Sequence, residues 1–264
     1  MIGLGLIQYI HQKDILANED PNDKNNDLIS GIANRVWNIN TGKVELGRFG
    51  WKASQPSIMQ HSADAFHNDM GLSTSLFPKS ENCTELQDVC YLFENGNGTE
   101  INSYEVSNEQ LALVEFYSSH IAVPLRRNHD DNQVLKGKKI FYESGCVACH
   151  TPKFKTVNTI YSDALSSQLI WPYSDFLLHD MGEGLADKVS AYDASGKEWR
   201  TQPLWGIGLT KEVNDHTNFL HDGRANNLLE AILWHGGEAE SSKQKILKLS
   251  VEEVENLIKF IESL

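Results

Sequence analysis

Long hydrophobic runs are missing from this sequence of 264 residues, and basic side chains are in the minority. No apolar stretch approaches the roughly 20 residues that a membrane-spanning helix needs, so we expect no membrane span. Only 23 lysines and arginines stand against 36 acidic side chains, which gives a formal net charge of −13. Such a chain repels phosphate backbones and anionic lipid, which excludes nucleic acid as a predicted partner.

A recognisable secretory leader is also missing. Residues 1–7 are apolar, but no basic residues precede them and no small-residue cleavage site follows. Cysteine is scarce, with four residues in all. Two of them, Cys83 and Cys90, lie seven residues apart in a polar stretch, which favours a local disulfide in an oxidising compartment. A free thiol pair and a pair of metal ligands are the alternatives.

Helical signals are present in five places. Apolar residues recur at helical spacing, and Ser107 with Gln110 and Ser250 with Glu253 form capping boxes. Gly71 and Gly145 follow two of the segments as stop signals. The predicted helices span residues 56–70, 107–121, 132–143, 228–235 and 250–264. The last is expected to pack on the third, in which Val134, Leu135, Ile140 and Phe141 are expected to point inward.

The intervening regions look irregular. Residues 11–45 are rich in Asn, Asp and Gly, residues 94–99 resemble an exposed linker, and residues 151–218 show no periodicity. The chain is long enough for one large domain or two small ones, and we favour two. A mainly α fold with long loops is therefore expected.

The remaining cysteines form the sequence Cys146-Val147-Ala148-Cys149-His150. Two thiols at this spacing reach the two vinyl groups of haem, and the adjacent imidazole turns onto the iron. This pattern predicts a c-type haem with Cys146 and Cys149 as attachment points and His150 as an axial ligand. Zinc would need further ligands, and a dithiol redox site would favour a βαβ context, so both are weaker alternatives.

The second axial ligand must come from the other histidines or the methionines. His235 ends a short apolar helix and is our first candidate. Met181 lies in the irregular region and is the alternative. It ranks second because a methionine also fills cores without any ligand role.

Four segments together resemble the bacterial di-haem cytochrome c peroxidase superfamily, and most closely its branch of di-haem oxidoreductases, also called thiol oxidoreductases. They are residues 47–53 (GRFGWKA), 64–71 (DAFHNDMG), 146–152 (CVACHTP) and 219–237, which begins FLHDGR and ends EAILWHGG. In the peroxidases a methionine that ligates the second haem follows the last of these motifs. His235 stands in that place, so the resemblance implies bis-histidine ligation by His150 and His235.

The resemblance also implies two cytochrome c-like domains, whereas this chain has a single Cys-x-x-Cys-His motif. We expect residues 1–104 to be part of a first domain with connecting loops, and residues 105–264 to be a cytochrome c-like domain with covalent haem. The sequence would then be a fragment without the first haem motif, or a homologue that lost it. A periplasmic location follows from haem attachment outside the cytoplasm.

Several other side chains are weaker candidates. His221 and Arg224 are predicted to orient haem propionates, or to satisfy a turn. Arg126 and Arg127 are expected to be a solvated pair, with contact to haem propionates as the alternative. Four tryptophans have core packing as their expected role and an electron path between haems as the alternative: Trp51, Trp171, Trp205 and Trp234. His61 and His67 are possible neighbours of the missing haem.

The leading functional hypothesis is an electron-transfer domain that exchanges single electrons with a partner protein or with a first-domain haem. One alternative is a catalytic di-haem peroxidase or thiol oxidoreductase in which this haem feeds a peroxidatic one. A second alternative is a structural or metal-binding domain without redox activity. Whether the chain itself is an enzyme is left open.

Overall fold

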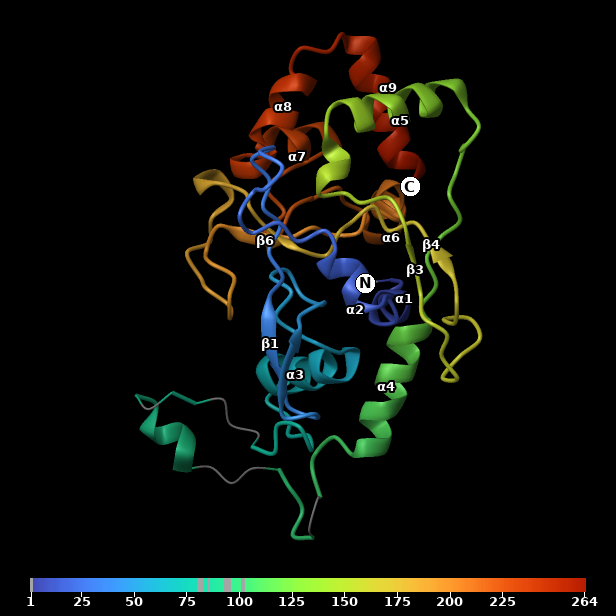
Figure 1. The fold of residues 1–264 in the computed structure, drawn as a ribbon. Helices are drawn as coiled ribbons and strands as arrows, with labels where there is room; N and C mark the ends of the chain where they lie inside the picture. The colour runs from blue at the N-terminus through green and yellow to red at the C-terminus, as the bar shows by residue number, and fades with distance from the viewer. Residues whose placement is uncertain (1, 80–82, 85, 93–95, 101–102) are drawn as a thin grey trace.

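The computed structural model describes residues 2–79, 83–84, 86–92, 96–100 and 103–264 (Figure 1). Helices alternate with short antiparallel strand pairs and long irregular connections. The α-helices are α1 (Leu4–Gln8), α2 (Gln12–Leu16), α3 (Ile58–Met70), α4 (Asn108–His120), α5 (Asn132–Glu143), α6 (Thr210–Asn214), α7 (Leu228–Trp234), α8 (Glu240–Ile246) and α9 (Val251–Ser263). Helices α5, α7, α8 and α9 gather at one end of the molecule and α3 with α4 at the other (Figure 1).

Three separate two-stranded antiparallel sheets occur in the described part of the chain. Strand β1 (Arg35–Asn38) pairs with β2 (Lys43–Leu46), β3 (Phe154–Lys155) with β4 (Leu169–Ile170), and β5 (Leu178–Asp180) with β6 (Glu198–Arg200). Short 3₁₀ helices are η1 (Asp88–Leu92), η2 (Cys146–Ala148), η3 (Glu183–Leu185), η4 (Ile207–Leu209) and η5 (Gly237–Ala239). The fold is thus helical with small sheets, which refines the mainly α expectation.

The five predicted helices are all present, and their ends follow from local hydrogen bonding. Ser107 and Ser250 both close reciprocal capping boxes. Gly71 ends α3 in the left-handed conformation at φ +67°, a region that glycine enters without a steric penalty. These helices were predictable because caps and stops act over only a few residues.

Two sequence expectations were wrong. Residues 11–45 are not all loop, because α2 and the β1–β2 hairpin lie there. Elements of four or five residues are too short to show periodicity. Leu135 does not point inward, since it is 47% exposed. The apolar face of α5 is instead completed by Gly137, which is buried against α9.

The packing of α5 on α9 was expected and is confirmed. A Cβ atom on Gly137 would lie 1.8 Å from the backbone oxygen of Asn256, so the two helices meet backbone to backbone at this point. Phe141 and Phe260 pack beside the crossing, with ring centroids 5.2 Å apart. Because α5 leads directly into Cys146, this contact fixes the position of the haem motif.

Another core cluster joins residues of the N-terminal part of the chain to residues of its middle. Ile7, Ile10 and Phe49 are buried together with Phe154 and Phe176. Residues 1–104 and 105–264 therefore share apolar packing along this boundary, and α4 also packs on α3 and α1.

The sulfur atoms of Cys83 and Cys90 lie within bonding distance, with their Cα atoms 6.1 Å apart. The linker expected at residues 94–99 lies partly outside the described residues. Across the described chain, no helix combines the length and apolar character needed to cross a membrane.

Candidate functional site

A cavity of about 390 Å³ lies at the end of the molecule that contains α5, α7, α8 and α9. We call it the central cavity. Its volume is within the range of small-molecule and cofactor sites. Its apolar wall comes from α5, the segment between β6 and α7, α7, α8 and α9, and includes Phe141, Leu204, Phe219, Leu228, Ile232, Ile246, Leu257 and Ile261.

His150 lies on the wall of the central cavity. Its Nδ1 donates a hydrogen bond to the backbone oxygen of Tyr173 at 2.9 Å. Burial lowers the pKa of His150 to about 4, so the ring is neutral at pH 7. A neutral ring that donates through Nδ1 carries its lone pair on Nε2, which is the atom required for binding a metal.

Cys146 and Cys149 line the same cavity, and neither forms a disulfide. Gly145 precedes them at φ +90°, and η2 then turns the chain so that both thiols and His150 face one space. Burial raises the pKa of Cys146 to about 12 and also raises that of Cys149. Both groups are therefore protonated thiols at neutral pH.

His235 lies immediately after α7 and also lines the central cavity. Its Nδ1 donates to the backbone oxygen of Ala231 at 2.7 Å, and burial lowers the pKa of the ring. His235 thus offers a free Nε2 in the same way as His150. Met181 lines the cavity too, so the structure brings both candidates for the second axial position to the same space.

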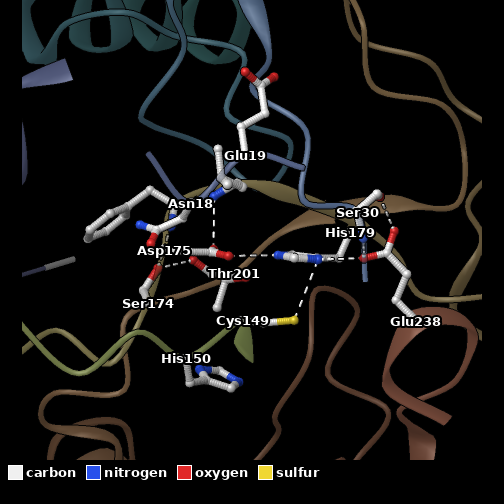
Figure 2. A network of polar contacts seen from close by, with 12 residues as sticks. Asn18, Glu19, Ser30, Cys149, His150, Ser174, Asp175, His179, Thr201 and Glu238 are labelled. Atoms are coloured by element: carbon white, nitrogen blue, oxygen red, sulfur yellow. Dashed lines mark hydrogen bonds and ion pairs between the residues drawn. The ribbon is translucent and has the colours of Figure 1, made fainter. Parts of the chain in front are cut away.

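A buried polar network forms the wall next to Cys149 (Figure 2). The ring of His179 is held between Asp175 Oδ2, at 2.8 Å from Nε2, and Glu238 Oε2, at 2.6 Å from Nδ1. Cys149 Sγ lies 3.5 Å from the same Nδ1. Ser30 donates its hydroxyl to Glu238 at 2.6 Å. The network therefore joins the haem motif to the segment that follows His235.

The two carboxylates fix the charge of His179. Burial alone would lower its pKa, but the charge of Asp175 and its hydrogen bond raise it well above the usual value. Burial would raise the pKa of Glu238, yet hydrogen bonds from His179 and Ser30 lower it overall. At neutral pH the network is an imidazolium between two carboxylates.

Arg200 is a site residue that sequence reasoning missed. It lines the central cavity, is buried, and leaves Nη1 without a hydrogen-bond partner among the described residues. Burial lowers its pKa to about 10, so the guanidinium remains charged. The only sequence signal was a lone arginine between Trp199 and the apolar segment 203–205, which is weak. A buried arginine with a free donor is suited to a carboxylate.

His221 reaches the central cavity and stacks on Trp199, with ring centroids 3.6 Å apart. Arg224 is not among the residues that line it. Its guanidinium instead pairs with Asp222 and lies 4.8 Å from the ring centroid of Trp234. The structure therefore brings His221, but not Arg224, to the predicted site.

Of the four candidate tryptophans, Trp51 lines the central cavity, whereas Trp171, Trp205 and Trp234 do not. Core packing was the right expectation for Trp205, which is 8% exposed, and wrong for Trp51, Trp171 and Trp234, which are 50%, 44% and 39% exposed. Large rings at a cavity mouth or on a short helix can remain partly exposed. The expectation of a solvated arginine pair was also wrong, because Arg126 and Arg127 both have buried guanidinium nitrogens.

His61 and His67 lie on α3, away from the central cavity, and each has a buried Nδ1 without a hydrogen-bond partner in the described structure. They are not brought together with His150.

The donor set of the central cavity fits haem. Two free thiols, two neutral imidazoles with available Nε2 atoms, an apolar wall and a buried arginine would suit a haem. By contrast, within the described ranges no three His, Cys, Asp or Glu side chains converge to hold a metal ion by themselves. The geometry thus gives the zinc alternative no support.

Comparison with known proteins agrees with this chemistry. A family model described as "Di-haem oxidoreductase, putative peroxidase" matches residues 1–264. A chain of Kuenenia stuttgartiensis hydrazine synthase, solved under 20 bar xenon, is similar with 21% identity and a TM-score of 0.39, over 61% of this chain and 57% of that one. At that TM-score the similarity supports no conclusion about fold or activity. A search of curated proteins finds no match. The match to the family model over the whole chain shows that this protein belongs to the di-haem oxidoreductase family.

Proposed function

We propose that the chain binds one haem covalently through Cys146 and Cys149, with His150 and His235 as axial ligands, and that it transfers single electrons. One observation carries the proposal: two neutral imidazoles and two free thiols line a single apolar cavity. When bound, the haem iron would supply one-electron chemistry by cycling between its ferric and ferrous states.

The residues of the chain have distinct parts in this proposal. The Tyr173 carbonyl orients His150, and the Ala231 carbonyl orients His235, so each ring presents Nε2 without rotating. Arg200 would hold a haem propionate through its unpaired Nη1. Leu257, Ile261 and the rest of the apolar wall exclude water, which lowers the local dielectric constant.

His235 is preferred to Met181 because its Nδ1–H is already fixed by a backbone acceptor, the usual arrangement for a histidine that binds a metal. Ligation by two imidazoles lowers the reduction potential relative to a His/Met pair. It also occupies both axial positions, so peroxide would have no open position at this site.

Several wider assignments belong to the same proposal. We assign residues 105–264 to a cytochrome c-like domain and residues 1–104 to part of a first one. We also assign a Cys83–Cys90 disulfide and a periplasmic location, both of which agree with the compartment in which c-type haem is attached. The redox partner would be another protein or a second haem.

The family description favours a second candidate function, a catalytic di-haem peroxidase or thiol oxidoreductase. In that case this haem would feed electrons to a second, reactive haem. Turnover of hydrogen peroxide, assayed in the presence of an electron donor, distinguishes the enzyme from a carrier that is only reduced and reoxidised.

An absorption spectrum tests the ligand assignment. The protein is matured in a host that attaches c-type haem, and the spectra of wild type, His235→Ala and Met181→Leu are compared. We expect a low-spin six-coordinate spectrum without a methionine-to-iron charge-transfer band, altered in His235→Ala and unchanged in Met181→Leu. The reverse pattern would assign the ligand to Met181. An intact mass equal to the bare polypeptide would refute haem attachment itself.

A further inference from the structure

A second cavity, of about 300 Å³, lies outside the haem site. We call it the Arg126 cavity. It is bounded by the segment before α5, the loop that contains β4, helix α1 and the end of α9. Its lining consists of Leu6, Val123, Pro124, Leu125, Arg126, Ala164, Gln168, Leu169, Ile170, Trp171, Tyr173, Trp205 and Leu264.

Arg126 is the only charged side chain among these residues, and it has no ion-pair partner in the described structure. Its Nε and Nη2 atoms are buried without hydrogen-bond partners. These two nitrogens lie on the same edge of the guanidinium group, and that edge donates two parallel hydrogen bonds to a carboxylate. The ring of Phe260, 5.1 Å from Cζ, holds the guanidinium in place.

Tyr173 supplies a second unused donor. It is fully buried, and its hydroxyl makes no hydrogen bond of normal geometry within the described chain. Burial raises the pKa of Tyr173, whereas the charge and hydrogen bonding of the Arg126 guanidinium lower it, and Tyr142 is a further neighbour of the same hydroxyl. Buried donors of this kind are rare in native proteins, and a missing ligand is one explanation for them.

The rest of the lining is apolar or already paired. Gln168 donates its amide to the backbone oxygens of Asp163 and Ser166, so it is engaged elsewhere. Trp171 is half-exposed, whereas Trp205 is buried. The cavity thus combines the guanidinium group of Arg126 and the hydroxyl of Tyr173 with flat apolar walls.

From this combination we infer that the Arg126 cavity binds a small organic monocarboxylate with a flat, apolar body. The carboxylate would accept from Arg126 Nε and Nη2 and from the Tyr173 hydroxyl, and the body would contact the tryptophan rings. An inorganic anion would leave the apolar walls unused, and a neutral aromatic molecule would leave the arginine unpaired. The inference does not depend on haem binding.

Calorimetric titration of the holoprotein with benzoate tests the inference that the Arg126 cavity binds a monocarboxylate. We expect one benzoate per chain, weakened roughly tenfold or more in Arg126→Gln, as is typical when a charged hydrogen-bonding partner is lost. Tyr173→Phe should weaken binding by about three- to tenfold. Arg127→Gln is the matched control. It removes the same charge one residue away, from a side chain that bonds to the Glu262 backbone oxygen and does not line the cavity, and it should leave the affinity unchanged.

Two further ligands separate the possible sources of binding. Benzyl alcohol has the ring without the charge, and inorganic phosphate has charge without the ring, so both should bind much more weakly than benzoate. Equal binding of either one, no binding of benzoate, or an unchanged affinity in Arg126→Gln would overturn the inference. If Arg126→Gln does not fold, nuclear Overhauser effects from benzoate to the Val123 methyl groups of the wild type decide, and their absence would also overturn it.

Discussion

One residue connects the two cavities, which differ in most of the polar groups that determine their chemistry. The backbone oxygen of Tyr173 accepts from His150, which lines the central cavity, and Tyr173 itself lines the Arg126 cavity. The central cavity contains thiols and imidazoles, whereas the Arg126 cavity contains one guanidinium and one hydroxyl. Both have apolar walls, so the difference in expected ligand comes from a few polar groups.

The cavities also differ in how well their polar groups are satisfied. In the central cavity, His150, His179 and His235 all have partners that fix their orientation, and Nη1 of Arg200 is a donor without a partner in the described structure. In the Arg126 cavity the donors of Arg126 and Tyr173 have none in the described structure. The first site is preorganised by the protein, while the second is completed only by a ligand.

The largest expected effect is the loss of covalent haem when Cys146 and Cys149 are replaced, in contrast to replacement of the other two cysteines. The double variant Cys146→Ala, Cys149→Ala should lose covalent haem completely, because no other thiol faces the central cavity. The double variant Cys83→Ala, Cys90→Ala is the control and should retain it. Intact mass of the denatured proteins measures the outcome. Haem retained by the first variant would show that attachment does not use these thiols.

The next largest expected effect is a loss of stability when the buried network of Asp175, His179 and Glu238 beside the central cavity is broken. His179→Gln leaves Asp175 and Glu238 buried without their cation, so we expect a loss of roughly 3 kcal/mol in unfolding free energy. His129→Gln, at an exposed position, is the control. Urea unfolding of the haem-loaded protein measures both, and a loss no larger than in the control would show that the network adds nothing to stability.

The pH dependence of that loss has a definite sign. The pKa of His179 is raised, so its contribution is full below its unfolded value of 6.5 and disappears as pH rises through the folded pKa. The pKa of Glu238 is lowered, so its contribution is full above 4.5 and disappears as pH falls through the folded pKa. The stability gap between wild type and His179→Gln should therefore be widest between these two values.

A smaller effect is expected where one helix contact supports both cavities. Helix α9 supplies Leu257 to the central cavity and is followed by Leu264, which lines the Arg126 cavity. Gly137→Ala would push α9 away and cost roughly 2 kcal/mol, despite a gain of about 1 kcal/mol in helix propensity. In Gly184→Ala the new Cβ would meet nothing closer than 3.9 Å, so this control should unfold like the wild type. Urea unfolding measures both variants. If Gly137→Ala had the same unfolding midpoint as the wild type, α5 and α9 would be able to separate without a loss of stability.

The smallest effect separates the two roles of Tyr173. Tyr173→Phe keeps the carbonyl that orients His150 and removes a buried hydroxyl that has no partner. The haem spectrum should not change, and the unfolding free energy should stay within about 1 kcal/mol of the wild type in the absence of ligand. A large destabilisation would show that the hydroxyl is already satisfied, which would remove one basis for the carboxylate site.

The longer helices were predictable because their signals are local. Asp131, Ser107 and Ser250 cap helices through bonds to residues two or three positions away, and the apolar stripe of α9 repeats over its whole length. The strand pairs were not, because β5 and β6 pair residues about 20 positions apart and are only three residues long. Nothing in so short a segment marks its partner.

The sequence by itself predicted the haem motif, since Cys146, Cys149 and His150 have the local spacing that covalent haem attachment requires. Only the tertiary structure placed His235, Met181 and Arg200 around the same cavity, because they are separated from the motif by 31 to 85 residues. The same holds for Arg126. Whether an arginine is solvated or buried without a partner depends on the packing of distant segments, which no local pattern encodes.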